Sequence, residues 1–257
     1  MHRIIFQAGP VTIYSYGLFV AIGFLLSTIL ILKDSRKFGI APEKMFDCMI
    51  AILAGGLVGG RLLFVIINYR YYLEYPLRAF MFYEGGLAYQ GAFVMAVIAG
   101  ILWARAKKIP FLKAADLVAP YIALAQSLGR IGCFLNGCCY GRVAESGLLV
   151  TFPYEPVTRI PTQIYSSFIL LLIFVLLIEM RGKRPFDGYI FCAYMILYSV
   201  FRFFMDFTRG DIYMFVFGMK LSQIISLVMF AGASVLYFIL KVRSRKAEKM
   251  WRSDSLQ

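Results

Sequence analysis

Charged residues are scarce in this chain, and histidine is almost absent. Asp, Glu, Lys and Arg make up 16% of the 257 residues, whereas 61% are hydrophobic. A soluble domain has roughly a quarter of its residues charged, so this composition excludes an ordinary soluble protein. The only histidine is His2, close to the N-terminus, where it is a poor candidate for catalysis. Zinc sites draw on several well-spaced Cys and His ligands, so we expect no metal.

The hydrophobic residues are gathered into long runs. Each run has the roughly 18–25 residues that an α-helix needs to cross a bilayer, which is too long for the roughly 10-residue strands of a membrane barrel. The sequence therefore predicts an all-α, polytopic integral membrane protein, with residues 1–257 as a single transmembrane domain and no cleavable signal peptide. The seven expected helices cover residues 12–32, 46–67, 86–104, 115–135, 162–180, 187–207 and 215–240.

Basic residues are distributed unevenly over the connections. Of the 27 Lys and Arg residues, 17 fall within 33–44, 105–113, 181–184 and a basic tail at 241–257, and seven fall in the other connections. Cytoplasmic loops of membrane proteins collect Lys and Arg. We therefore expect the N-terminus outside and the C-terminus in the cytoplasm, with the tail solvated beside anionic lipid. The same rule accounts for the net charge of +13 without a nucleic-acid partner.

Three arginines lie inside hydrophobic runs: Arg61, Arg130 and Arg202. Burying an arginine in a bilayer costs about 2.5–3.5 kcal/mol, so each needs a partner. An internal ion pair or a snorkelling side chain would explain any one of them. In the expected orientation, however, all three lie in the outer leaflet. Together they indicate a site for an anion, and a phospholipid phosphate suits the planar fork of donors on a guanidinium group.

The sixth hydrophobic run contains YSVFRFFMDFTR. Within it, Tyr198, Arg202, Asp206 and Arg209 follow one another at spacings that line one face of a helix. Asp206 is therefore placed to pair with Arg202 or Arg209 and to orient it. A plain salt-bridged helix face is the alternative interpretation.

The segment GRIGCFLNGCCYG, residues 129–141, is similar to the signature of the prolipoprotein diacylglyceryl transferase family. Other elements resemble that family in the same order along nearly the whole chain, and Asp116 stands at the family's acidic position before the signature. Six ordered elements are a far more specific match than a lone GRxG. The supporting elements are YGLFVAIGF, GGRLLFVI, GGLAYQG, RIPTQIY and FRFFMDFTRGD.

The resemblance implies an enzyme of the bacterial cytoplasmic (inner) membrane with its active site toward the outer leaflet. Such enzymes transfer diacylglyceryl from phosphatidylglycerol to the cysteine thiol in the signal peptide of a prolipoprotein. They form a thioether, release glycerol phosphate and use no cofactor. The implied partners are phosphatidylglycerol, the signal peptide and membrane lipid. The alternatives are a lipid- or anion-binding transporter and a catalytically divergent homologue. Transporters often contain internal repeats and broken helices, and neither is evident here.

This reaction requires cations at the phosphate and removal of the thiol proton. We expect Arg130 and Arg202 to hold the phosphate, with Arg61 or Arg209 in support. The expected catalytic residues are Arg130, Arg202, Asp206, Gln90 and Tyr16; the expected headgroup-binding residues are Arg130, Arg202, Arg61, Arg209, Asn136, Gly132, Gly141 and Tyr198.

The chain departs from the family pattern in two places. Many members carry histidine where Gln90 stands, and glutamine cannot accept a proton. Proton removal then falls to another group or to water, and the candidate groups are Asp206, Glu84 and a low-pKa cysteine. Cysteines also replace an asparagine and a glutamate in the signature, which leaves three thiols without a settled role. The open roles for Cys133, Cys138 and Cys139 are a structural role, a disulfide and a metal site. Pairing of the two adjacent cysteines is strained, and a metal site is disfavoured because zinc needs more well-spaced ligands.

Overall fold

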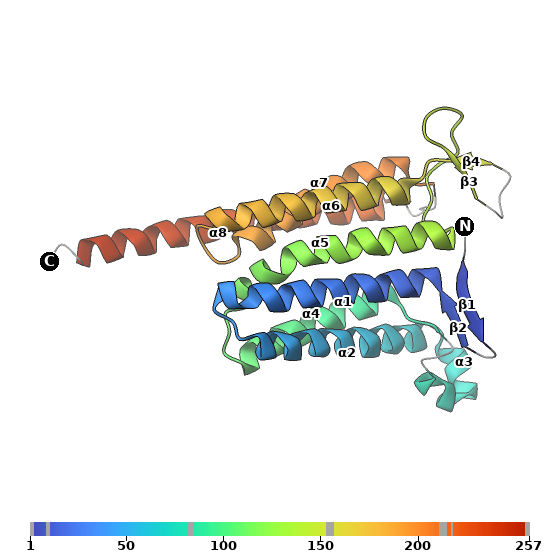
Figure 1. Cartoon of the computed structure of the whole chain (residues 1–257), viewed down its shortest axis with the longest axis horizontal. Helices are drawn as coiled ribbons and strands as arrows, with labels where there is room; N and C mark the ends of the chain where they lie inside the picture. The colour runs from blue at the N-terminus through green and yellow to red at the C-terminus, as the bar shows by residue number, and fades with distance from the viewer. Residues whose placement is uncertain are drawn as a thin grey trace. The chain divides into compact units, whose positions relative to one another are not determined.

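The computed structural model describes residues 3–8, 11–81, 85–152, 157–210, 215–216 and 218–254. Within these ranges seven helices are long and apolar enough to cross a membrane, which confirms the expected fold class (Figure 1). The seven are α1 (Ser15–Ser35), α2 (Pro42–Ile67), α4 (Tyr89–Ala106), α5 (Phe111–Asn136), α6 (Thr162–Met180), α7 (Tyr189–Thr208) and α8 (Leu221–Asp254).

Shorter elements connect these helices. Three antiparallel hairpins are present among the described residues, each formed by two strands that follow one another in the chain. The hairpins are β1 (Ile4–Ala8) with β2 (Val11–Tyr14), β3 (Val150–Thr151) with β4 (Thr158–Arg159), and β5 (Phe215–Val216) with β6 (Met219–Lys220). The short helices are α3 (Tyr69–Glu74), η1 (Arg36–Phe38), η2 (Pro76–Phe80) and η4 (Arg181–Lys183).

Helix α8 differs most from its expected bounds, and the other six spanning helices lie within four residues of theirs at each end. Helix α1 begins at Ser15 instead of residue 12, because the residues before it pair as β2 with β1. Helix α8 begins at Leu221 instead of residue 215, because β5 and β6 pair there. Helix α8 also continues to Asp254, through a basic tail that is rich in the good helix formers Lys, Arg, Ala and Glu.

The chain divides into two compact units. Unit 1 comprises Met1–Leu30 and Ala115–Gln257, and unit 2 comprises Ile31–Ala114. Unit 1 therefore contains most of α1, most of α5, and all of α6, α7 and α8. Unit 2 contains α2 and α4. Each unit is described by itself.

In unit 2, glycines bring α2 and α4 into close contact. A Cβ atom added at Gly59 would lie 2.5 Å from the carbonyl oxygen of Gly91, and one added at Gly91 would lie 2.3 Å from that of Gly59. Small residues are the usual means by which membrane helices approach so closely. The glycine-rich stretch before Arg61 therefore serves packing of the α2–α4 pair.

In unit 1, α1 packs closely on α5, and α7 packs on α6 and α8 (Figure 1). A Cβ atom at Gly23 would lie 3.0 Å from the carbonyl oxygen of Ala125, and the Ser27 hydroxyl donates to the Tyr121 carbonyl at 2.9 Å. The apolar core among α5, α6 and α7 is built from Ala119, Ala123, Leu170, Ile173, Leu177, Ile190, Tyr194, Phe201 and Met205.

Asp116, near the start of α5, caps the start of α7. Its Oδ2 accepts the backbone N–H of Gly188 at 2.8 Å, and its Oδ1 accepts that of Phe191 at 2.9 Å. The carboxylate is fully buried and lies 3.7 Å from the Arg184 guanidinium. The first N–H groups of a helix have no partner within the helix, so here a side chain from another helix supplies the acceptors that a local cap usually provides.

We expect Asp116→Ala to lower the free energy of unfolding by about 1–3 kcal/mol, because it leaves buried N–H groups of α7 without acceptors. Thermal unfolding in detergent measures this loss. The control is Asp187→Ala, which removes a half-exposed carboxylate 3.5 Å from Arg184. An exposed ion pair of this kind contributes about 0–1 kcal/mol. Equal destabilisation by the two changes would contradict the capping role of Asp116.

Candidate active site

The signature segment begins with a tight turn at the end of α5. The N–H of Gly137 donates to the carbonyl of Phe134, and the N–H of Cys138 donates to that of Cys133, both at 3.1 Å. This pair of bonds is the Schellman motif, which needs a left-handed residue directly after the helix. Gly137 supplies it, with φ +72°. Because Cys139 also has a positive φ of +62°, the chain folds back over the last turn of α5.

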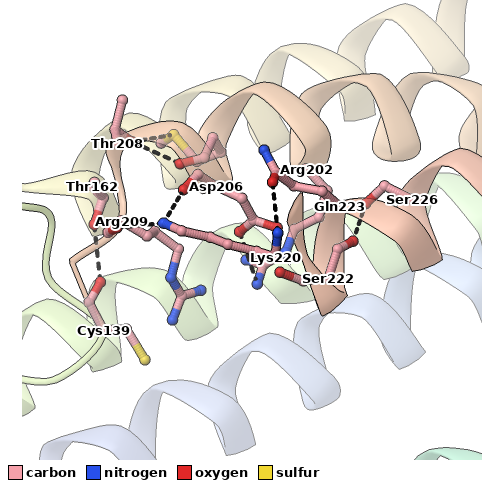
Figure 2. Close-up of polar contacts among 11 residues, drawn as sticks. Cys139, Thr162, Arg202, Asp206, Thr208, Arg209, Lys220, Ser222, Gln223 and Ser226 are labelled. Atoms are coloured by element: carbon pink, nitrogen blue, oxygen red, sulfur yellow. Dashed lines mark hydrogen bonds and ion pairs between the residues drawn. The ribbon is translucent and has the colours of Figure 1, made fainter. Parts of the chain in front are cut away.

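The first residues of α6 hold this turn in place. The Thr162 hydroxyl donates to the carbonyl of Cys139 at 2.9 Å (Figure 2), and the Gln163 amide donates to the carbonyl of Cys138 at 2.8 Å. Both side chains are buried. The Thr-Gln pair of RIPTQIY therefore supplies donors to carbonyls that the turn leaves without helical partners.

The end of the signature is joined to α6 and α7 through backbone contacts. The N–H of Gly141 donates to the carbonyl of Ile160 at 2.9 Å, and the N–H of Arg142 donates to that of Thr208 at 2.8 Å. A Cβ atom at Gly141 would lie 2.7 Å from the Ile160 oxygen. Only glycine lets these segments approach as closely as they do.

We expect Gly141→Ala to lower the free energy of unfolding by about 1–3 kcal/mol, the usual cost of overpacking. The control is Gly129→Ala, since the nearest atom to a Cβ there is Val20 Cγ2 at 3.9 Å. That change removes a flexible residue from a helix and should leave stability unchanged or raise it by up to about 1 kcal/mol. Thermal unfolding compares the two, and similar stability of both variants would contradict the close-approach argument.

Arginines from α5 and α7 converge in unit 1. Arg202 interacts electrostatically with Arg130 and Arg209, and both of these also interact with the thiol of Cys139. Arg130 is half-buried, and no hydrogen bond or ion pair joins its side chain to any residue in the described part of the chain. Its guanidinium donors are thus available to a ligand.

Asp206 lies one helical turn after Arg202. Its Oδ1 is 3.2 Å from Arg202 Nη2, and its side chain is fully buried (Figure 2). Neither carboxylate oxygen forms a hydrogen bond with a described residue, and the buried hydroxyl of Ser222 also has no such partner. Buried polar atoms are normally hydrogen-bonded. The Asp206 oxygens therefore keep acceptor capacity that no described hydrogen-bond donor uses.

Lys220 fixes the end of α7. Its ammonium group donates to the backbone carbonyls of Asp206 at 2.5 Å and Arg209 at 2.7 Å (Figure 2). A cation at a helix C-terminus satisfies free carbonyls and opposes the negative end of the helix dipole. Sequence reasoning counted Lys220 only as a loop cation and missed this role. The available signal was a single lysine directly before an apolar run.

The three signature thiols form one cluster. The sulfur atoms of Cys133, Cys138 and Cys139 all lie within 4.8 Å of one another, and all three residues are free thiols. Hydrogen bonds from the thiols of Cys133 and Cys138 lower the pKa of the Cys139 thiol, and the positive charges of Arg209 and Arg130 act in the same direction.

The remaining expected residues of unit 1 surround this cluster. The Tyr16 phenol interacts electrostatically with the three thiols and Arg130, and its backbone lies against Gly132, where a Cβ would be 3.2 Å from Tyr16 Cα. The Asn136 side chain lies near the Cys138 thiol. Tyr198 packs its ring 5.8 Å from that of Tyr194 and interacts electrostatically with Arg202.

Arg61 and Gln90 lie in unit 2, and Glu84 lies outside the described residues. Gln90 is exposed in the first turn of α4. Arg61 is buried and directs its five N–H donors at backbone carbonyls of its own unit. The acceptors are Ala79 at 2.9 Å, Gly85 at 2.5 Å, Gly86 at 3.2 Å, Arg78 at 2.5 Å and Met81 at 3.0 Å.

Several known proteins are similar to this chain in sequence. The family model described as prolipoprotein diacylglyceryl transferase matches residues 3–239. The chain is 35% identical over 239 residues to phosphatidylglycerol–prolipoprotein diacylglyceryl transferase 2 of Clostridium perfringens, covering 91% of this chain and 93% of that protein. A transferase of the same name, without the numeral, from Clostridium tetani is 38% identical over 232 residues, covering 88% and 93%. One from Bacillus licheniformis is 28% identical over 259 residues, covering 97% and 96%.

Proposed function

The chain belongs to the prolipoprotein diacylglyceryl transferase family, and we propose that it moves the diacylglyceryl group of phosphatidylglycerol to a cysteine thiol in the signal peptide of a prolipoprotein. The second product is glycerol phosphate. We also propose that the chain is a multi-pass protein of the bacterial cytoplasmic membrane, with its N-terminus outside and its site toward the outer leaflet. The distribution of Lys and Arg over the connections supports this orientation.

The single observation that carries this function is the state of Arg130. Its half-buried guanidinium, inside a spanning helix, has no hydrogen bond or ion pair with a described residue. A cation at such a position is costly without a counter-charge. The phosphate of an acidic lipid brings that charge and accepts two parallel N–H bonds from one guanidinium group. Arg202, within electrostatic range, supplies a second cation for the same phosphate.

The reaction is a displacement at carbon. The sulfur of the signal-peptide cysteine attacks the carbon of the diacylglyceryl group that is bonded to the phosphate oxygen. A C–S bond forms, the C–O bond breaks, and its electron pair stays on the oxygen of glycerol phosphate. Arg130 and Arg202 stabilise the negative charge that grows on this oxygen, an effect that is strong where water is excluded.

We assign removal of the thiol proton to Asp206. Its carboxylate is buried, and both oxygens lack a hydrogen-bond partner among the described residues, so a lone pair is available. Gln90 cannot take this role, because an amide does not accept a proton at neutral pH. Arg202, 3.2 Å away, fixes the direction of the carboxylate.

The other expected residues have supporting roles. Tyr16 and Asn136 line the region beside the thiols and offer hydrogen-bond donors, while Gly132 and Gly141 allow the close approach of neighbouring segments. Arg61 holds the backbone on both sides of residues 82–84 through its five carbonyl acceptors, at residues 78–81 and at 85–86, and we assign it to that structural task. The remaining headgroup contacts come from Arg209 and Tyr198.

The test uses the full chain in vesicles that contain phosphatidylglycerol labelled in its headgroup glycerol. A peptide with a lipobox cysteine is the acceptor, and the same peptide with alanine at that position is the control. We expect the cysteine peptide to gain one diacylglyceryl group for each labelled glycerol phosphate released. Movement of intact labelled lipid with an unmodified peptide would support a transporter instead. An unmodified peptide and unmoved lipid would indicate a catalytically divergent homologue.

A further inference from the structure

The proposed reaction uses none of the thiols of Cys133, Cys138 and Cys139. Yet their sulfur atoms lie within 4.8 Å of one another, with Cys133 buried and the other two half-buried. The scarcity of histidine made a metal site unexpected from sequence. Two adjacent cysteines and one five residues earlier do not resemble a zinc motif, and it is the turn after α5 that brings all three together.

The backbone of this cluster is fixed before any ligand binds. The Schellman bonds place Cys138 next to Cys133. The left-handed conformation of Cys139 then turns the chain back over the last turn of α5. A left-handed conformation is uncommon for a residue with a side chain. Thr162 and Gln163 hold it through the carbonyls of Cys139 and Cys138. Only side-chain rotation is needed to bring the sulfurs onto one ion.

The number of donors selects the kind of ion. Three sulfurs arranged in a plane around an ion at about 2.3 Å would be separated by about 4.0 Å, so the cluster must close by less than about 1 Å. In the described chain, no histidine nitrogen or carboxylate oxygen joins this group. Structural zinc requires four protein ligands. Thiolates select soft ions such as Cu(I), and Cu(I) does not require a fourth ligand.

Charge favours the same ion. Three thiolates with one Cu(I) carry a net charge of −2, which is costly to bury alone. Arg130 and Arg209 lie within electrostatic range of Cys139 and offset this negative charge. A trivalent or divalent ion would need less compensation, so the positive surroundings discriminate in favour of the monovalent one.

We propose that Cys133, Cys138 and Cys139 form a three-thiolate binding site for Cu(I). On binding, each thiol gives its proton to the solvent and each sulfur donates an electron pair to the same ion; no electron transfer takes place. The site lies beside the proposed phosphate-binding arginines, but its existence does not depend on the transferase activity.

The test measures Cu(I) binding to the full chain in detergent, kept reduced under anaerobic conditions, in competition with a chromophoric Cu(I) chelator. We expect one tightly held Cu(I) per chain. X-ray absorption at the copper edge should show three sulfur neighbours at about 2.3 Å. Cys133→Ala, Cys138→Ala and Cys139→Ala should each weaken binding by more than the roughly 10–100-fold that loss of an outer-shell partner causes in other metal sites.

The matched controls are Cys48→Ala and Cys192→Ala, which remove the two buried cysteines outside the cluster and should leave Cu(I) affinity unchanged. The absorption measurement on the unaltered chain does not depend on any variant folding correctly. Two or fewer sulfur neighbours, equal loss of affinity in the control variants, or retention of Zn(II) with no retention of Cu(I) would each overturn the proposal.

Discussion

Arg130→Ala will reduce diacylglyceryl transfer by a factor of about 100 to 1,000, the loss that follows removal of one donor to a developing oxyanion. The reason is that the Arg130 side chain makes no hydrogen bond or ion pair with a described residue, so its removal leaves no protein group without a partner. Folding and membrane insertion should therefore be unaffected. The loss should appear in the chemical step, measured as lipidated peptide formed in a single turnover.

Two further variants sharpen this prediction. Arg130→Lys keeps the charge but loses the planar fork, so its activity should lie between those of the unaltered chain and the alanine variant. Arg142→Ala is the matched control, because this arginine directly follows the signature but its side chain is exposed. Its structural contact is made by the backbone N–H, which alanine retains. Undiminished transfer by Arg130→Ala would remove this arginine from the phosphate site.

The spanning helices were predictable because the bilayer imposes a length and an apolar composition on each of them. Helices α1 and α8 begin later than expected for the same reason. The strands before Ser15 and Leu221 contain apolar residues next to the apolar helices that follow, so a hydropathy reading merges strand and helix into one run. The pairing that separates them depends on backbone hydrogen bonds between strands, and composition does not report those bonds.

The residues of the site were predictable to the extent that burial makes them conspicuous. An arginine inside a hydrophobic run stands out, which is why Arg130 and Arg202 were found. The same argument could not separate Arg61 from them. Its partners are backbone carbonyls, and any sequence offers those. Whether a buried cation serves a ligand or a loop is decided by its acceptors, which only coordinates reveal.

Contacts between distant residues account for most of what the sequence did not indicate. Asp116 accepts the N–H of Gly188, 72 residues later, at the start of α7, and Lys220 donates to carbonyls at the end of the same helix. Each role depends on tertiary packing that brings the side chain next to a helix end distant in the sequence. The thiol cluster differs, because Gly137 and the neighbouring cysteines create it within seven residues. A Gly directly after a helix signals a Schellman turn, and that signal was available from sequence.

Asp206→Asn should lower the rate of transfer by about 100- to 10,000-fold, the usual contribution of a positioned general base. The asparagine has nearly the same shape but cannot accept the proton of the incoming thiol. Asp206→Glu, which keeps the carboxylate, should retain part of the activity. Asp187→Asn removes a half-exposed carboxylate and serves as the control. The measurement is again the single-turnover rate of peptide lipidation.

Asp206 also pairs with Arg202, so the test must separate proton removal from orientation of the arginine. An unperturbed cysteine thiol has a pKa of about 8.5, and above that value the peptide provides its own thiolate. Raising the pH from 7 to 9 should therefore restore much of the activity of Asp206→Asn, while the deficit of Arg130→Ala relative to the unaltered chain should persist. If the loss of activity in Asp206→Asn is the same at pH 7 and pH 9, Asp206 acts only through Arg202. The binding of phosphatidylglycerol would then weaken together with the rate, because a misdirected guanidinium loses the phosphate before any bond is broken.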